Sequence, residues 1–264
     1  MIKILIIGKK SFLGSNLKCF LSKSYDVDIY SFDQLKKRNT IFFEKYTHII
    51  NCAIHPKYIK SKYNIKYDLD RVFIKKFYKI NFYYIFLNTR KIYSPKENIS
   101  EFSKIKPIDV YAQNKFITEK YLKNKIKSNL ISLRISNIIG VRIFKNNRNH
   151  HKLFFDNFLK YKKNVKNKKL IVNDDFKDFL SIDQFCLIIA LIIKFKVKGI
   201  FNVSISKKIY LSELIKWLDK KLFKKINFMK PSKNSFTLSN TKLIKKIKIN
   251  LTKNQLKTFC EKLI

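Results

Sequence analysis

Cysteine is scarce in this sequence, and its four copies form no pattern. Cys19, Cys52, Cys186 and Cys260 lie far apart, and they do not combine with the four histidines at the spacings of a metal site. We therefore expect no bound metal and no disulfide framework. Dispersed thiols of this kind are typical of a reduced, cytoplasmic protein.

Long apolar runs are absent. The run at 186–193, CLIIALII, falls well short of the roughly 20 residues that a membrane-spanning helix needs, which predicts a buried helix instead. The apolar run at the N-terminus is too short for a signal peptide, and no small-residue cleavage site follows it. We expect no membrane partner.

Acidic residues, arginine and alanine are also few. The 264 residues include 18 Asp and Glu against 58 Lys and Arg, a formal net charge of +40. Such a charge is typical of proteins that bind nucleic acid or anionic membranes. However, only six of the basic residues are arginine, the main reader of nucleic acid. The residues in excess (Lys, Ile, Asn, Phe and Tyr) share A/T-rich codons, so genome composition explains the scattered lysines better, and we expect no nucleic-acid partner.

Glycine is rare, and two of its four copies stand within the first fourteen residues, MIKILIIGKKSFLG. The apolar run up to Ile7 suits a strand covered on both faces of a parallel sheet. Gly8 ends this run, and Gly14 opens a stretch with helical spacing of its apolar residues. A strand, tight turn and helix in this order direct backbone N–H groups and the positive helix end at an anion. This predicts a cradle for a dinucleotide pyrophosphate, with an ordinary strand-to-helix turn as the alternative.

Strands and helices alternate along the rest of the chain, which predicts an α/β fold with a doubly wound, Rossmann-like parallel sheet. The interval between the second and third strands is short. We therefore expect an edge strand to be lost there, or reduced to residues 40–43. The expected strands are 26–32, 47–53 and 81–88, and the expected helices are 66–79 and 109–125.

The end of the second strand bears on the choice of cofactor. Asp33 lies nineteen residues past Gly14, close to the usual spacing of about 20, and would accept hydrogen bonds from the adenine ribose of NAD. Counting from the strand start puts Ser31 at that place instead. Ser31 with the basic residues 36–38 would suit the 2′-phosphate of NADP. Both cofactors stay open, as does a solvated loop for residues 36–38.

A hydroxyl group and a Tyr–Lys pair are candidates for chemistry. Thr89 ends a buried strand, at the edge of the sheet where ligands of such folds bind. Tyr111 and Lys115 stand four residues apart and so share one face of a helix. The ammonium, with a cationic nicotinamide, would lower the tyrosine pKa towards values useful at neutral pH. An isolated pair of this kind has little weight, because the chain has 14 tyrosines.

Taken together, seven segments resemble the extended short-chain dehydrogenase/reductase superfamily, in its nucleotide-sugar epimerase/dehydratase branch. They span nearly the whole chain and use all four glycines. The similar segments are Gly8-Lys-Lys-Ser11-Phe-Leu-Gly14, Asn51-Cys-Ala53, Thr89-Arg-Lys-Ile-Tyr93, Tyr111-Ala-Gln-Asn-Lys115, Leu133-Arg-Ile-Ser-Asn137-Ile-Ile-Gly140, Lys177-Asp-Phe-Leu-Ser-Ile-Asp183 and Gly199-Ile-Phe-Asn202-Val203.

The resemblance implies a role for each of these residues. It implies an NAD(P)-binding Rossmann-like domain over 1–140, with 177–203 crossing back, and a smaller, mainly substrate-binding lobe over 141–264. Thr89, Tyr111 and Lys115 would be catalytic, and Thr89, Asn137 and Lys177 would bind the nucleotide sugar. A homodimer is compatible with it. The implied cofactor-binding residues are Gly8, Lys10, Ser11, Phe12, Leu13, Gly14, Ser31, Asp33, Asn51, Cys52, Ala53, Tyr111 and Lys115.

The chain also departs from the family pattern. Ser11 replaces the middle glycine of the turn, and Lys177 replaces an arginine that would hold a diphosphate through two bonds. Arg90 and Lys91 follow Thr89 where sugar 4,6-dehydratases carry Asp-Glu, which disfavours elimination of water. His150 and His151 could reach the sugar, although a solvated loop is the favoured interpretation for them.

The resulting hypothesis is an NAD(P)-dependent oxidoreductase acting on a nucleotide-activated sugar, either a 4-ketoreductase or an epimerase. One alternative is a catalytically altered relative that binds nucleic acid or an acidic partner through its basic surface. Another is a small-ketone reductase of the same superfamily. The joint presence of Thr89, Tyr111 and Lys115 favours the enzyme.

Overall fold

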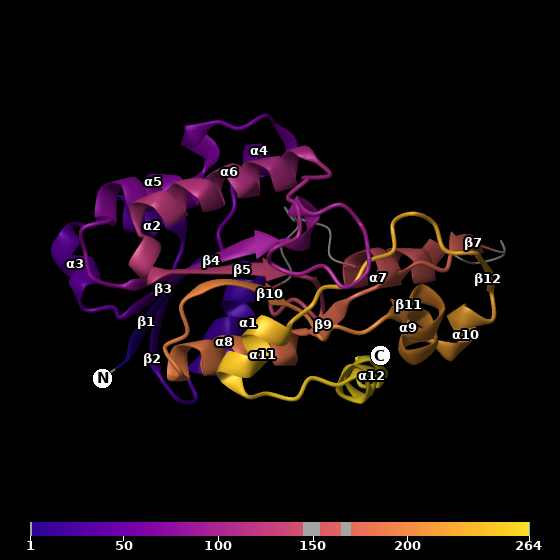
Figure 1. Ribbon diagram of the computed structural model, residues 1–264. Helices are drawn as coiled ribbons and strands as arrows, with labels where there is room; N and C mark the ends of the chain where they lie inside the picture. Colours follow the sequence, from indigo (N-terminus) through magenta and orange to yellow (C-terminus); the bar gives the residue numbers. More distant parts are fainter. Residues whose placement is uncertain (1, 145–153, 165–169, 264) are drawn as a thin grey trace.

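A six-stranded, all-parallel sheet forms the centre of the protein (Figure 1). The computed structural model describes residues 2–144, 154–164 and 170–263. The strand order β10-β5-β4-β3-β1-β2 confirms the predicted α/β, Rossmann-like fold. The strands are β1 (Lys3–Ile7), β2 (Asp26–Tyr30), β3 (His48–Asn51), β4 (Tyr83–Thr89), β5 (Leu130–Ile135) and β10 (Gly199–Val203).

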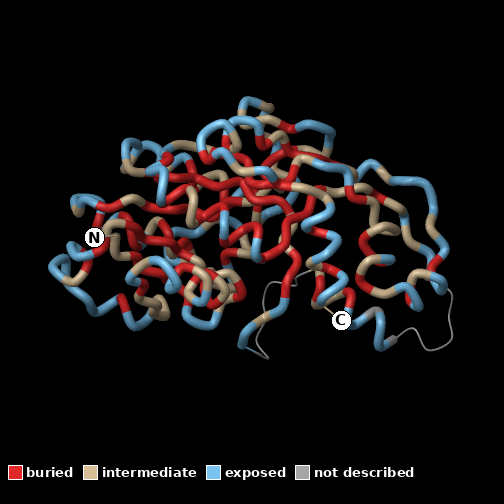
Figure 2. The backbone as a smooth tube through the Cα atoms, turned by 90° about the horizontal axis from the view of Figure 1, so that it is seen from below, coloured by how far each residue is buried: buried red, intermediate tan, exposed pale blue. Residues whose placement is uncertain are grey.

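Helices cover both faces of the sheet, because successive strand residues point to opposite faces and are apolar in both directions. On β1, Ile4 and Ile6 join one hydrophobic cluster, while Leu5 and Ile7 join another. The first cluster packs against α1 (Phe12–Leu21), α8 (Ile182–Lys194) and α11 (Thr241–Ile247), and the second against α5 (Leu69–Phe77) and α6 (Val110–Lys125). Figure 1 shows these two sets on opposite sides of the sheet, and Figure 2 shows the buried residues along the strands. The predicted buried helix at 186–193 is confirmed as part of α8.

The segment between β2 and β3 contains no strand, which confirms the expected loss of an edge strand; the alternative, a strand reduced to 40–43, is wrong because these residues are helical. It forms α2 (Phe32–Lys36) and α3 (Thr40–Glu44), and β2 is the edge strand of the sheet. Asn39 caps α3 by accepting from the backbone N–H of Phe42 at 3.1 Å. This cap and the burial of Phe43 stabilise one helical turn where the β-branched and aromatic composition favoured a strand.

Short strand pairs and helices gather at one end of the sheet, on the right in Figure 1. Here β6 (Asn137–Ile139) pairs with β9 (Phe179–Ser181), β8 (Phe176–Lys177) with β11 (Ile209–Tyr210), and β7 (Leu170–Asn173) with β12 (Ile226–Met229). After β9, the chain returns to the central sheet through α8 and β10. The predicted domain boundary near residue 140 stays a proposal. The remaining helices are α4 (Pro56–Lys60), α7 (Phe154–Asn164), α9 (Leu211–Leu218), α10 (Lys220–Phe223) and α12 (Lys253–Glu261).

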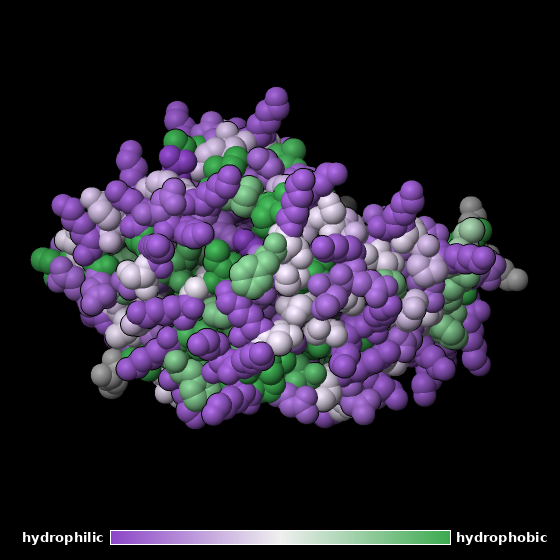
Figure 3. Space-filling model, in the orientation of Figure 1, coloured by the Kyte–Doolittle hydropathy of each residue, from purple (hydrophilic) through white to green (hydrophobic). Residues whose placement is uncertain are grey.

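The surface is polar and the cysteines are unpaired. Hydrophilic residues cover most of the face shown in Figure 3. All four cysteines are free thiols. Within the described ranges, no cluster of His, Cys, Asp or Glu could hold a metal ion, and no helix is long and apolar enough to cross a membrane.

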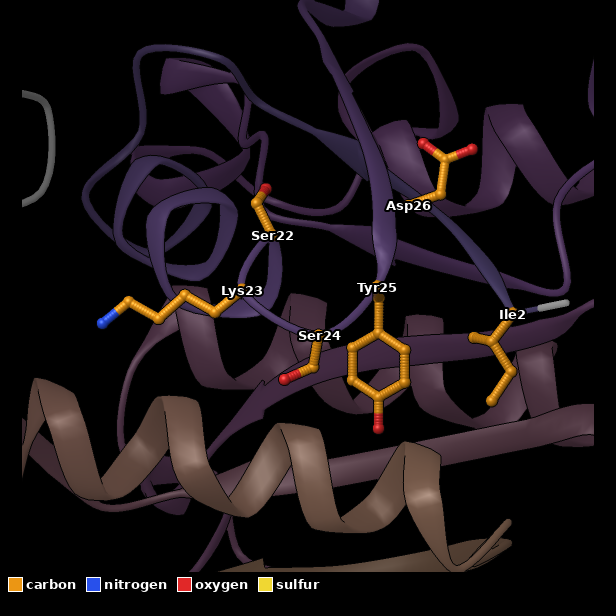
Figure 4. Close-up of a pocket in the computed structure, with 6 residues that line it drawn as sticks. All are labelled: Ile2, Ser22, Lys23, Ser24, Tyr25 and Asp26. Atoms are coloured by element: carbon orange, nitrogen blue, oxygen red, sulfur yellow. The ribbon is translucent and has the colours of Figure 1, made fainter.

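A hollow of about 500 Å³ lies past the end of α1 that is opposite to the glycine turn. Figure 4 shows the residues that line it. It opens where β1 and β2 begin, whereas ligands of parallel sheets bind where strands end. The functional site is therefore expected at the opposite edge of the sheet, where the strands end. The hollow is lined by Ile2, Ser22, Lys23, Ser24, Tyr25 and Asp26.

Candidate active site

The turn after β1 has room for glycine alone at its two ends. Gly8 has a φ of +118°, and a Cβ built there would lie 2.9 Å from the backbone nitrogen of Ala53. A Cβ on Gly14 would lie 2.6 Å from the carbonyl oxygen of Gly8. Both distances are too short for real contacts, so the turn is folded as tightly as the sequence pattern predicts. Such a turn leaves its backbone open to a close approach by a pyrophosphate.

Ser11 replaces the middle glycine of the turn, and its hydrogen bonds explain how the turn accommodates a serine there. Its hydroxyl donates to the carbonyl oxygen of Gly8 at 2.8 Å and accepts from the backbone N–H of Gly14 at 3.0 Å. Ser11 is therefore the N-cap of α1. Among its neighbours, Lys10 is exposed, whereas Phe12 is buried in the core. Leu13 packs at the edge of the same cluster.

Replacing Gly14 with alanine is expected to impair cofactor binding. The new Cβ would meet the Gly8 carbonyl at 2.6 Å, so the turn must open and the free energy of unfolding should fall by about 1–3 kcal/mol. NAD(H) titration and urea unfolding measure both effects. Gly199→Ala is the control for lost stability with the turn intact, because its φ of +116° strains an alanine, whereas its Cβ would lie 3.7 Å from the nearest atom. Unchanged NAD(H) affinity in Gly14→Ala would contradict the role of the turn.

Ser31 and Asp33 follow β2 next to the glycine turn, and both have partners within the chain. Ser31 caps α2 and shares three hydrogen bonds with Gln34. Asp33 is largely exposed and pairs with Lys36 at 2.6 Å, while Arg38 stacks on the ring of Phe42. NAD and NADP therefore both remain candidates for the cofactor that would bind beside Ser31 and Asp33.

The segment after β3 forms the floor beneath the turn. Asn51 is buried, and its side-chain oxygen accepts from the backbone N–H of Ala53 at 3.0 Å. Cys52 lies directly under Gly14, and burial raises the pKa of its thiol. Cys52 is therefore a packing residue of the floor, in contact with the two glycines that the sequence pattern had selected.

The structure brings the segments carrying Thr89 and Tyr111 together. Thr89 ends β4 and its hydroxyl accepts from the backbone N–H of Lys91 at 3.3 Å. The Lys91 ammonium in turn pairs at 2.8 Å with Asp109, the N-cap of α6. Tyr111 lies in the first turn of α6, and its ring meets that of Tyr58 edge-on at 6.5 Å. Both residues thus lie at the edge where the strands end.

Lys115 lies one helical turn further, in a buried position. Its ammonium is 4.5 Å from the ring centroid of Phe86 on β4 and 3.6 Å from the carboxylate of Asp70 on α5. Both side chains of this ion pair are 6% exposed. A buried ammonium needs such a partner, so Lys115 is a fixed cation on the same helix face as Tyr111.

Asp70 is a site residue that the sequence reasoning missed. It is 4% exposed, and its Oδ1 accepts from the amide of Asn51 at 2.9 Å and from the hydroxyl of Tyr84 at 2.8 Å. The sequence did contain a signal that could have identified Asp70. An acidic residue three positions before Phe73 lies on the apolar face of the predicted helix, and acidic residues are few in this chain. Asp70 thus connects the floor of the turn with Lys115.

The expected lowering of the Tyr111 pKa is wrong for the chain by itself. Burial raises the pKa of Tyr111, and the nearby Asp70 and Asp109 add to this, so that together they outweigh the lowering by Lys115. For Lys115, burial acts to lower the pKa, but Asp70, Tyr111 and Asp68 raise it overall. At neutral pH the site therefore holds a neutral phenol beside an ammonium, which is a proton donor in place.

The two further substrate candidates lie on the short strands beyond β5. Asn137 is half-buried, and its amide donates to the carbonyl oxygen of Asp178 at 3.2 Å. Lys177 lies 4.0 Å from Asp175. Burial lowers the pKa of Lys177; Asp175 opposes this shift, and the cations Arg90 and Lys91 add to it. His150 and His151 lie outside the described residues.

Several solved structures of other proteins have a similar fold. The chain resembles a UDP-N-acetylglucosamine 4-epimerase from Methanobrevibacter ruminantium M1 in complex with UDP-N-acetylmuramic acid, with a TM-score of 0.78, 16% identity and coverage of 99% of this chain and 96% of that one. A dTDP-4-dehydrorhamnose reductase from Clostridium acetobutylicum ATCC 824 has a TM-score of 0.76, 19% identity and coverage of 99% of both chains. A dTDP-glucose 4,6-dehydratase from Bacillus anthracis str. Ames in complex with NAD has a TM-score of 0.75, 15% identity and coverage of 100% and 96%. At these identities the likeness establishes the fold.

A family model establishes more than the fold. The model of the NAD dependent epimerase/dehydratase family matches residues 4–204, from the glycine turn through β10. No protein of curated function matches the chain in sequence. The matched range is well over half of the chain and includes every segment on which the resemblance was based. The chain therefore belongs to the NAD-dependent epimerase/dehydratase family.

Proposed function

We propose that this protein is an NAD(P)-dependent oxidoreductase that acts on a nucleotide-activated sugar, as a 4-ketoreductase or an epimerase. The observation that carries the proposal is the buried Lys115, held by Asp70 one turn after Tyr111, on the helix that packs beside the strand ending in Thr89. Two structural neighbours support the ligand classes: the dehydratase is in complex with NAD, and the epimerase with UDP-N-acetylmuramic acid.

The glycine turn fits a dinucleotide. Any Cβ at Gly8 or Gly14 would collide with the turn, so both positions need glycine for the tight turn that lets a pyrophosphate approach the backbone at the start of α1. Lys115 would hold the nicotinamide ribose. When bound, the nicotinamide supplies or accepts the hydride.

The side chains of the site transfer the proton that accompanies the hydride. Thr89 would hold the reacting sugar oxygen by hydrogen bonding, next to Tyr111. As a carbonyl is reduced, the neutral Tyr111 phenol gives its proton to the developing alkoxide, and Lys115 stabilises the phenolate that forms. In the opposite direction Tyr111 accepts the proton. The raised pKa of Tyr111 keeps the phenol protonated at neutral pH, which is the form that reduction requires.

The residues after Thr89 support an oxidoreductase over a dehydratase. Elimination of water needs an acid and a base beside the sugar. Arg90 stacks on Phe236, and the ammonium of Lys91 is paired with Asp109. Neither side chain is a carboxylate, and arginine does not exchange its proton at neutral pH.

Mass spectrometry of the nucleotide that co-purifies with the protein tests the proposal and decides between NAD and NADP. We expect a nicotinamide dinucleotide, and oxidation of its reduced form when UDP- or dTDP-linked 4-keto sugars are added. Epimerisation would appear as interconversion of the matching sugars without net change of the cofactor. Failure to bind either dinucleotide would refute the proposal. Cytoplasmic location, a homodimer and the absence of a nucleic-acid partner stay predictions.

Replacing Asp70 with asparagine is expected to shift the pH profile towards lower pH. The charges that face Tyr111 are Asp70, Asp109 and Lys115, and Asp70 raises the pKa of both Tyr111 and Lys115. Without its charge both pKa values fall. Oxidation of a sugar alcohol requires the deprotonated tyrosine, so its rate should rise with pH earlier in the variant than in the wild type.

Steady-state rates over a pH series measure this shift. Tyr84→Phe is the matched control, because it removes a hydrogen bond to Asp70 but leaves the carboxylate charge. A purely structural role of Asp70 would lower the rates of both variants without moving either profile. A shift in Tyr84→Phe as large as that in Asp70→Asn would contradict the electrostatic role.

A further inference from the structure

Arg90 is a shielded cation whose hydrogen-bond donors are not used. Its guanidinium carbon lies 3.8 Å from the ring centroid of Phe236, which is fully buried. Nε and Nη1 are shielded from solvent, and neither has an acceptor within the parts of the chain that the structure describes. Unpaired buried donors are costly, especially on a charged group. Stacking on a ring offsets part of this cost but satisfies no N–H group.

The position of Arg90 connects it with the proposed sugar site. It directly follows Thr89 and begins the short 3-10 helix Arg90–Ile92. The next residue, Lys91, is paired at 2.8 Å with Asp109, two residues before Tyr111. Arg90 therefore lies on the same segment as the Thr89 hydroxyl, and the Lys91–Asp109 ion pair joins this segment to the start of the helix that carries Tyr111.

The other charges near Arg90 do not neutralise it. Among the described residues, no carboxylate lies within ion-pair distance of its guanidinium, whereas Lys91 has Asp109 and Lys177 has Asp175. Burial lowers the pKa of Arg90 to about 10, so it stays cationic at neutral pH. A fixed positive charge with free N–H groups is a site for an anion.

We propose that Arg90 binds a carboxylate on the sugar of the substrate, so that the enzyme acts on acidic nucleotide sugars. This inference rests on the proposed function, because Thr89 marks the sugar end of the substrate. Phe236 covers a face of the guanidinium. Nη2 is not among the shielded donors, so the carboxylate would approach from the side of Nη2 and reach the shielded Nε or Nη1 next to it. A guanidinium holds a carboxylate through two parallel hydrogen bonds, a geometry that an ammonium cannot reproduce.

Calorimetric titration of the full-length protein with bound NAD tests this inference. The probes are two matched pairs, UDP-glucuronate with UDP-glucose and dTDP-glucuronate with dTDP-glucose. The wild type should bind the acidic member of at least one pair about 10- to 100-fold more tightly. Arg90→Met should remove this preference without changing the affinity for the neutral member. Arg90→Lys, which keeps the charge without the fork, should retain only part of it.

Arg71→Met is the matched control for charge and stacking. The Arg71 guanidinium lies 4.3 Å from the ring centroid of Tyr121, but it also donates to the hydroxyl of Tyr63 at 3.1 Å. Its removal should leave the preference intact, and circular dichroism verifies the fold of each variant. If Arg90→Met does not fold, the wild-type preference and its partial loss in Arg90→Lys still decide the matter.

Three results would overturn the inference in different ways. Equal weakening of both members of a pair and of free UDP would assign Arg90 to the diphosphate instead. Equal affinity of the wild type for acidic and neutral sugars would refute the carboxylate while leaving the proposed function in place. Failure of the wild type to bind any of the four nucleotide sugars would reject the proposed function as well.

Discussion

Replacing Tyr111 with phenylalanine is expected to lower the turnover rate by about 10²- to 10⁴-fold, the usual contribution of a positioned proton donor. The variant loses the hydroxyl that gives the proton to the developing alkoxide. Its ring remains, so the edge-on contact with Tyr58 and the burial of Lys115 should persist. Affinity for the dinucleotide should therefore change little, and kcat should fall much more than KM rises.

Stopped-flow measurement of cofactor oxidation separates the chemical step from binding. Tyr121→Phe is the matched control, because it makes the same substitution on the same helix, in a residue stacked against Arg71 and remote from Thr89. We expect wild-type rates for the control. Full activity of Tyr111→Phe on a nucleotide sugar would show that another group transfers the proton.

The strands and the glycine turn were predictable because their signals are local. In a run such as that of β1, the residues that point to either face of the sheet are apolar, which is typical of a strand between two helical layers. Gly14 is required by its short distance to the nearby Gly8 carbonyl, which follows from the strand-turn-helix order, and Gly8 by its positive φ; the contact of Gly8 with Ala53 is not local. The family membership followed from seven such local segments in the expected order.

The ion pair of the site was not predictable because it joins residues far apart in the chain. Asp70 meets Lys115 across 45 positions, and Asn51 completes the contact from a third element. The pattern of one helix cannot show which side chain of another helix faces it. The sign of the Tyr111 pKa shift depends on the same contact, because it is a balance between burial, Asp70 and Lys115.

Removing the carboxylate of Glu119 is expected to cost about 3–5 kcal/mol of the free energy of unfolding, the usual effect of breaking a buried ion pair. Glu119 accepts from Nε and Nη2 of Arg134, with the Nη2 bond at 2.9 Å, and from the amide of Asn88 at 2.7 Å. The charged side chains are 7% and 3% exposed for Arg134 and Glu119. Glu119→Ala would leave the arginine buried without this partner.

Urea unfolding of Glu119→Ala measures this loss, with Glu261→Ala as the matched control. Glu261 pairs with Lys257 at 3.9 Å on the exposed side of α12, where such a pair contributes about 0.5 kcal/mol or less. A loss no larger than in the control would show that Arg134 finds another acceptor.

A double substitution separates stability from the geometry of the site. Replacing both Glu119 and Arg134 with methionine removes the two charges together, and apolar replacement of a buried pair is often neutral. The double variant should therefore be more stable than Glu119→Ala. Glu119 lies one turn after Lys115 on α6 and bonds to Asn88, the residue before Thr89, so it fixes the helix on β4. We accordingly expect the double variant to recover stability but not turnover. Recovery of both would mean that packing alone positions Tyr111 and Lys115 against Thr89.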